Sequence, residues 1–444
     1  MQRRGIEQSA CFDLKTIATS EIDHYALTSY AAVHCGLNDD LIEEYDYPPV
    51  DKMIKEFSDM NIGYDFKKKK EKDWTKYRKG KRLKELKKYY LASVLQNNLG
   101  DISRVSELPY ADLWFYSFPC TDVSIAGEQK GLSKKSNTRS GLLWEVERLL
   151  KTSISQNRNP DYLCMENVKN LVGKNHINDF KLWLKTLDDC GYNTYYSVIN
   201  AKNCGIPQNR ERVFAISIKK EIDLGNFTFP KPFDNGLRLL NFLEDTVDDK
   251  YYISEERAKN FKCTDQTFTK NIIGTIKEKQ KSIGQRDNIY NPAGFISTLL
   301  STDYKGAKMT PCIVNGNANK LIKEYELSGG KWDKKFDHQK RCYSIYGISP
   351  TLITYSGVGH VAKIVEGSIN NNVVIRTLTP KEYFLLMGFT ETDFDTVKRI
   401  GLSDTQLYKI AGNGIVTNCV QLLFEHLYQS QFNNKYICTD DNFE

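Results

Sequence analysis

The chain has 444 residues, of which 40% are hydrophobic and 27% charged, so it is long enough for two or three domains with a sizeable core. It contains no apolar run of membrane-spanning length and no signal-peptide layout. Its eleven cysteines lack the paired spacing of a disulfide framework or a zinc site. These properties exclude a membrane-spanning or disulfide-stapled protein and predict a cytoplasmic one with reduced thiols.

The formal net charge of +6 is unevenly distributed along the chain. Residues 67–88 hold 13 Lys or Arg and 3 Asp or Glu, so the net positive charge of this segment alone is larger than that of the whole chain. Such a segment is typical of a solvated, partly helical insertion, and also of an arm that contacts phosphates. Trp74 and Tyr77 between the charges fit both interpretations.

Apolar spacing, caps and glycines predict the elements in chain order. A strand ending near Glu21 precedes a helix from about Asp23. Further strands are predicted in "ADLWFYSFPC" (111–120), "PDYLCMENV" (160–168), "YYSVINA" (195–201) and "RVFAISI" (212–218). Helices are predicted in "GLLWEVERLLKTSI" (141–154) and "DFKLWLKTLDDCGY" (179–192), the second ending at Gly191.

This alternation of strands and helices up to about residue 220 predicts an open α/β sheet. Residues 236–375 are rich in Gly, Asn, Lys and Thr, and predict a smaller, mostly β or irregular second domain. "RTLTPKEYFLLMGF" (376–389) returns to helix, with Thr379 as N-cap and Pro380 at the first helical position. We therefore expect a first domain at 1–235 with a basic insertion at about 50–96, the second at 236–375, and a C-terminal segment at 376–444 that rejoins the first.

Several polar residues fall where ligands bind in such folds, outside the carboxyl ends of strands. They are Glu21, Asp101, Pro119-Cys120 and Glu166-Asn167. "QNRERVF" (208–214) adds Arg210 and Arg212 just before a strand. Each feature alone is more typical of core packing, a cap or a surface ion pair. Only their combination in this order indicates a functional site.

In this order the segments resemble the cytosine-5 DNA methyltransferase family over most of the chain. "FPC" with "SIAG" resembles its nucleophile loop, "MENV" its glutamate motif and "QNRERVF" its arginine motif. "SEIDHYALTSYAAVH" resembles the segment whose acid binds the cofactor ribose, and "RTLTPKEYFLLMGF" and "AGNGIVTNCV" resemble the two C-terminal motifs. The resemblance implies a Rossmann-like, S-adenosylmethionine-dependent methyltransferase sheet with a target-recognition domain at 236–375.

The family's chemistry implies a role for each catalytic residue. Carbon 5 of cytosine attacks a methyl sulfonium only after a thiolate has added to carbon 6, and Cys120 would supply that thiolate. Glu166 would protonate or hydrogen-bond ring nitrogen 3, which requires a carboxyl that keeps a proton, as burial favours. Arg212, with Arg210, would hold the carbonyl oxygen of the base and the loop, and Asn167 would orient its neighbours. The target nucleotide must first be flipped out of the duplex.

The resemblance implies S-adenosylmethionine as methyl donor and assigns six residues to it. Glu21 would bind its ribose hydroxyls, and Asp101 would accept a hydrogen bond from its adenine amino group. Ile22 and Ile102 would pack on the adenine, although both also fit the core. Pro119 and Asn413 complete the set, with Asn413 closing the site.

The chain departs from the family at two places. The family opens with a strand and a Phe-x-Gly-x-Gly loop around the methionine end of the cofactor, whereas only Gly5 precedes Glu21 here. We expect a chain that lacks about one strand and one glycine-rich turn, with cofactor binding in question. Thr121 stands where the family usually has glutamine after the cysteine, and its shorter reach predicts altered contacts to DNA.

Three alternative functions compete with a DNA methyltransferase. The first is a DNA-binding remnant degraded at the cofactor loop, and the second is a methyltransferase acting on transfer RNA, whose relatives generally have a smaller recognition domain. The third, a cysteine hydrolase, lacks a histidine motif among the six histidines. We expect a bacterial or phage protein that acts as a monomer on duplex DNA, either beside a cognate restriction endonuclease or as an orphan modifier.

The Thr121 departure yields a test. Thr121→Gln should retain methyl transfer and change only the affinity for DNA, because a threonine hydroxyl and a glutamine amide both donate hydrogen bonds. The measurement is the turnover and DNA affinity of the variant beside the unchanged chain. Loss of all turnover would contradict the interpretation.

Overall fold

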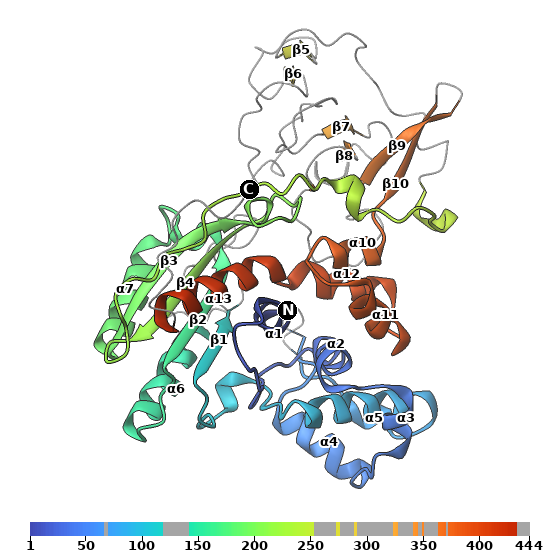
Figure 1. Ribbon diagram of the computed structural model, residues 1–444. Helices are drawn as coiled ribbons and strands as arrows, with labels where there is room; N and C mark the ends of the chain where they lie inside the picture. The colour runs from blue at the N-terminus through green and yellow to red at the C-terminus, as the bar shows by residue number, and fades with distance from the viewer. Residues whose placement is uncertain are drawn as a thin grey trace.

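The computed structural model describes residues 1–65, 70–118, 142–252, 272–275, 288–290, 323–326, 341–344, 349, 363–369 and 372–432 (Figure 1). The α-helices are α1 (Gln2–Ser9), α2 (His24–Cys35), α3 (Asp39–Glu44), α4 (Val50–Asp59), α5 (Gly80–Leu95), α6 (Leu143–Ser155), α7 (Ile177–Asp189), α10 (Pro380–Leu385), α11 (Glu391–Arg399), α12 (Asp404–Asn413) and α13 (Thr417–Phe432). The strands are β1 (Leu113–Ser117), β2 (Tyr162–Val168), β3 (Tyr192–Asn200), β4 (Glu211–Lys219), β5 (Ile272–Thr275), β6 (Asn288–Tyr290), β7 (Lys323–Glu326), β8 (Arg341–Ser344), β9 (Lys363–Ile369) and β10 (Asn372–Thr377).

The larger described sheet has the strand order β1-β2-β4-β3. β1 runs parallel to β2, whereas β4 runs antiparallel to both β2 and β3. Because β4 runs the opposite way, its first residues lie beside the carboxyl end of β2, and Arg212 pairs with Val168. The expected α/β fold is confirmed, with a mixed sheet.

Helices cover both faces of this sheet. Successive side chains of a strand point to opposite faces, and β2 shows this alternation directly. Leu163 and Met165 pack with α6 and α7 in one core cluster, while Cys164 packs with α1, α12 and α13 in another. Figure 1 shows α6 and α7 on one side of the sheet and α13 crossing the other. The result is a three-layer arrangement of helices, sheet and helices.

The strand predicted to end near Glu21 is wrong. The segment forms only an isolated parallel bridge between Thr19 and Asn98, in which the Leu99 amide donates to the Thr19 carbonyl at 2.8 Å. The Asn98 side chain makes the hydrogen bonds that a neighbouring strand would make to Glu21. It accepts from the Glu21 amide at 2.9 Å and donates to the Glu21 carbonyl at 3.0 Å. The helix predicted from Asp23 is confirmed, with Asp23 as the N-cap of α2.

The basic insertion folds into a packed helical unit against α2. Trp74 is fully buried in the core of this unit, and its indole N–H donates to the Ile62 carbonyl at 2.9 Å. Lys72 Nζ lies 4.3 Å from the Trp74 ring centre and 2.8 Å from His24 Nε2. α5 keeps a basic face in solvent, with Lys81 and Lys84 exposed. The helical interpretation of the insertion therefore holds for the described residues.

Helices of the C-terminal segment pack in one core cluster with residues of β2 and β4. Thr379 caps α10 in a reciprocal pair with Glu382, and Pro380 is the first residue of the helix. Four short strands between residues 323 and 377 form a sheet of order β10-β9-β8-β7, which Figure 1 shows above α10. Much of 236–375 lies outside the described residues, so the domain boundaries stay predictions. Among the helices that the structure describes, none is both long and apolar enough to cross a membrane.

Packing of the insertion can be tested at Trp74. Trp74→Ala should lower the free energy of unfolding by about 3–5 kcal/mol, because it leaves a large cavity in the core and removes a buried hydrogen bond. The measurement is chemical denaturation of the variant. Lys84→Ala on the exposed face of α5 serves as control, with an expected change within about 0.5 kcal/mol. Equal small effects at both positions would mean that the insertion is not packed.

Candidate active site

The first cluster of site residues lies at the carboxyl end of β2. Ser117, the last residue of β1, pairs with Glu166 of β2. Asn167 is buried, and its side-chain amide donates to the Phe118 carbonyl at 3.0 Å while its oxygen accepts from the Val168 amide. Phe118 is followed directly by Pro119 and Cys120, which lie outside the described residues. Asn167 thus holds the chain at the point where the Pro119-Cys120 segment begins.

Glu166 lies beside Arg212 and is largely shielded from solvent. Glu166 is 6% exposed, with Arg212 Nε 3.2 Å from one carboxylate oxygen and Ser117 Oγ 3.4 Å from the other. Burial raises the pKa of Glu166, and the charges of Arg212 and Arg210 only partly offset that effect. Burial therefore favours the protonated form of this carboxyl more than it would for an exposed glutamate.

Arg210 has different contacts from Arg212, although the sequence placed them in one motif. Arg210 is 3% exposed, and its guanidinium donates to the carbonyls of Gly412 and Gly414 at 3.0 and 2.6 Å. Asn413, between these glycines at the end of α12, is exposed. In this structure Arg210 therefore links the start of β4 to the "AGNG" segment.

The second cluster lies at the start of α2. One carboxylate oxygen of Glu21, Oε1, accepts from the backbone amides of Ile22 and Asp23, each at 2.8 Å. Burial raises the pKa of Glu21, although these two amide hydrogen bonds act to lower it. Both bonds go to Oε1, and no residue that the structure describes donates to the second oxygen. Ile22 is half-buried beside it.

Asp101 faces this cluster from the turn after the insertion. Its Oδ1 accepts from the Ser103 amide and hydroxyl at 3.0 and 2.7 Å, and its Oδ2 accepts from the Asn61 side-chain amide at 2.7 Å. Burial alone would raise the pKa of Asp101, but these hydrogen bonds hold it below its ordinary value. Ile102 follows, half-buried, and its carbonyl accepts from Arg148 at 3.3 Å.

α12 connects the two clusters. Lys409 Nζ on this helix lies 2.6 Å from the Asp23 carboxylate, next to Glu21 and Ile22. The carboxyl end of the same helix accepts the hydrogen bonds of Arg210. The structure therefore places Glu166, Asn167 and Arg212 in one cluster, and Glu21, Ile22, Asp101 and Ile102 in another.

Sequence reasoning missed several residues that shape these clusters. They are Ser117, Asn98, Lys409 and Asn61. Asn98 lies only three residues before Asp101, so its closeness in the sequence to a predicted site residue could have identified it. Lys409 and Asn61 carry no such signal, because their partners are distant in the sequence.

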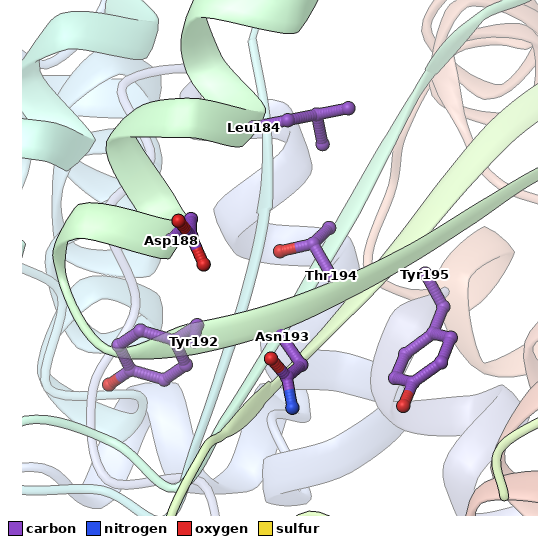
Figure 2. Close-up of a pocket in the computed structure, with 6 residues that line it drawn as sticks. All are labelled: Leu184, Asp188, Tyr192, Asn193, Thr194 and Tyr195. Carbon is purple, nitrogen blue, oxygen red and sulfur yellow. The ribbon is translucent and has the colours of Figure 1, made fainter. Parts of the chain in front are cut away.

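A separate pocket has a volume of about 380 Å³, and Figure 2 shows the residues that line it. It is lined by Leu184, Asp188, Tyr192, Asn193, Thr194 and Tyr195. Tyr192 begins β3 and pairs with Lys219 at the far end of β4, whereas Glu166 pairs with Phe214 nearer the middle. The pocket therefore lies toward the opposite end of the sheet. Within the described ranges, no group of three or more His, Cys, Asp or Glu side chains could hold a metal ion.

Comparison with known proteins gives the family of this chain. The family model of the C-5 cytosine-specific DNA methylases matches residues 70–429. The chain is 32% identical over 419 residues to the type II methyltransferase M2.ScrFI of Lactococcus lactis subsp. cremoris, covering 94% of this chain and 92% of that protein. The chain therefore belongs to the C-5 cytosine-specific DNA methylase family and is an enzyme of this type.

Other similar proteins span nearly the whole chain. The orphan methyltransferase M.SssI of Spiroplasma monobiae is 28% identical over 429 residues, covering 96% of this chain and 94% of that protein. A solved structure of the Entamoeba histolytica methyltransferase EhMeth is 15% identical and covers 96% of this chain and 94% of its own, with a TM-score of 0.48.

The buried position of Glu166 predicts a pH effect on stability. A raised pKa in the folded state means that protonated Glu166 favours folding at and below about pH 4.5, its ordinary pKa, and that this contribution is lost as the pH rises through the raised value. Glutamine does not titrate. The free energy of unfolding of the unchanged chain should therefore fall relative to that of Glu166→Gln as the pH rises. Denaturation of both proteins over a pH series measures this difference, and an increase with pH would show that the Arg212 ion pair outweighs burial.

Proposed function

We propose that this enzyme transfers a methyl group from S-adenosylmethionine to carbon 5 of a cytosine flipped out of duplex DNA, through a covalent adduct with Cys120. The supporting observation is the buried Glu166 beside Arg212, at the sheet end where Asn167 holds the residue before Pro119-Cys120. A proton-keeping carboxyl and a cation side by side suit a base that gains negative charge during reaction.

The second cluster fits S-adenosylmethionine by the chemistry of its donors and acceptors. Glu21 has a carboxylate oxygen left for the ribose hydroxyls, and Asp101 presents an ionised carboxylate to the adenine amino group. Ile22 and Ile102 are half-buried and supply apolar contact for the ring, and Asn413 would close the site with Pro119. When bound, the cofactor supplies an electrophilic methyl group on a sulfonium.

The thiolate of Cys120 adds to carbon 6 of the cytosine, and the ring electrons move toward carbon 5 and nitrogen 3. Glu166 donates its proton, or a hydrogen bond, to nitrogen 3 and so stabilises the adduct. Arg212 holds the carbonyl oxygen of the base and keeps the Glu166 carboxyl in place. After carbon 5 has taken the methyl group, it loses its hydrogen as a proton to water, the electrons of that bond form the double bond between carbons 5 and 6, and the Cys120 bond to carbon 6 breaks with its electrons returning to sulfur. Nitrogen 3 gives any proton it received back to Glu166, which restores the neutral aromatic ring.

The DNA side of the proposal rests on the family and on the second domain. Carbon 6 of a stacked, paired cytosine is out of reach of a side chain, so the nucleotide must be flipped. Residues 236–375 would read the target sequence, and the enzyme would act as a monomer. M2.ScrFI is named a type II methyltransferase and M.SssI an orphan one, so both a restriction-modification role and an orphan role agree with the relatives.

Transfer of labelled methyl from S-adenosylmethionine tests the proposal. Mixed-sequence duplex DNA and transfer RNA are offered to the unchanged chain, to Cys120→Ser and to Cys11→Ser, a control at a half-buried free cysteine. The unchanged chain and the control should label duplex DNA, and Cys120→Ser should be slower by roughly 10³-fold or more, as when other covalent enzymes lose their nucleophile. Label on transfer RNA alone, or full activity of Cys120→Ser, would contradict the proposal.

A further inference from the structure

The turn that follows α4 in the helical insertion contacts both segments of the second cluster. The Asp101 amide donates to the Met60 carbonyl at 2.9 Å, and the Gly63 amide donates to the Ile22 carbonyl at 2.7 Å. Arg104 donates to the Ser58 carbonyl at 2.8 Å. Residues 58–63 therefore form a wall between the two segments proposed to hold the adenine.

The contact between this turn and the Asp101 segment is close. Gly100 has a φ of +76°, and a Cβ atom at this position would lie 2.4 Å from the Met60 carbonyl oxygen. Only glycine meets both conditions, a left-handed backbone and no room for a side chain. The insertion and the Asp101 turn therefore pack backbone against backbone.

Asn61 is the residue of this wall whose side chain has an unused group. It has a φ of +57° and is 7% exposed. Its Nδ2 donates to Asp101 Oδ2 at 2.7 Å, whereas its Oδ1 is buried with no hydrogen-bond partner among the described residues. A buried acceptor without a donor is costly, so the site is complementary to a ligand that brings an N–H.

The hydrogen-bonding capacity of Asp101 also indicates a ligand that donates an N–H. A carboxylate offers about four acceptor sites, and Asp101 uses three of them for the Ser103 amide, the Ser103 hydroxyl and Asn61. One site is left, beside the unused Oδ1 of Asn61. An exocyclic amino group has two N–H bonds, which matches the two remaining acceptors.

We propose that Asn61 is a binding residue for the cofactor, and that its Oδ1 accepts the second N–H of the adenine 6-amino group while Asp101 accepts the first. This inference rests on the proposed function, because it takes the cofactor to be S-adenosylmethionine. It gives the insertion a role in selecting a 6-aminopurine, a role that the sequence did not indicate.

Titration calorimetry with two ligands tests the assignment without turnover. One ligand is S-adenosylhomocysteine, and the other is its analogue with hydrogen in place of the 6-amino group. Asn61→Gly removes the amide and keeps the left-handed backbone unstrained. Asn157→Gly is the matched control, since Asn157 is also left-handed, at a φ of +52°, but exposed.

Asn61→Gly should weaken binding of S-adenosylhomocysteine by roughly tenfold, the scale of one buried hydrogen bond, and should change binding of the deamino analogue by less than about twofold. Asn157→Gly should change neither. Equal weakening of both ligands by Asn61→Gly would overturn the inference, because it would show a role in folding the wall alone. Failure of the unchanged chain to bind S-adenosylhomocysteine would overturn the cofactor assignment and, with it, this inference.

Discussion

The antiparallel pairing of β4 between β2 and β3 is the constraint on which the arrangement of the catalytic cluster depends. It brings the start of β4 to the carboxyl end of β2, so that Arg212 lies beside Glu166. From the residue just before β4, Arg210 reaches the carbonyls of Gly412 and Gly414. The short segment from Arg210 to Arg212 therefore has two roles. Its charges lower the pKa of the buried Glu166 carboxyl, and Arg210 joins the sheet to the C-terminal helices.

The second cluster is held in a different way. Only a single bridge joins the Thr19 and Asn98 segments, and side chains supply the other contacts. Asn98 fixes the backbone of Glu21, Lys409 pairs with Asp23, and Asn61 joins the insertion to Asp101. Because few of these contacts belong to a ladder, the geometry of this cluster depends on individual polar residues and on the packing of the insertion around Trp74.

The residues that sequence reasoning located correctly are those with local signals. Asp23 and Thr379 are N-caps, as their position before apolar helical segments predicted, and Glu166 and Asn167 lie in the last three residues of a strand that its apolar run predicted. The strand before Glu21 was mispredicted, because strand formation depends on neighbours that local pattern does not reveal. The contacts of Arg210 and Asn61 were out of reach for the same reason, since Arg210 bonds to residues about 200 positions away and Asn61 to one 40 positions away.

The central claim is that Cys120 forms a bond to the target base beside Glu166, and trapping of that bond tests it most directly. A duplex carrying 5-fluorocytosine at the target position allows the thiolate to add and the methyl group to transfer, but fluorine cannot leave carbon 5 as a proton does, so the adduct should persist. We expect a stable protein–DNA complex that requires S-adenosylmethionine, with the nucleotide mapped to Cys120 by mass spectrometry of the digested complex. Attachment at another cysteine, or no stable complex under conditions in which ordinary duplex is methylated, would contradict it.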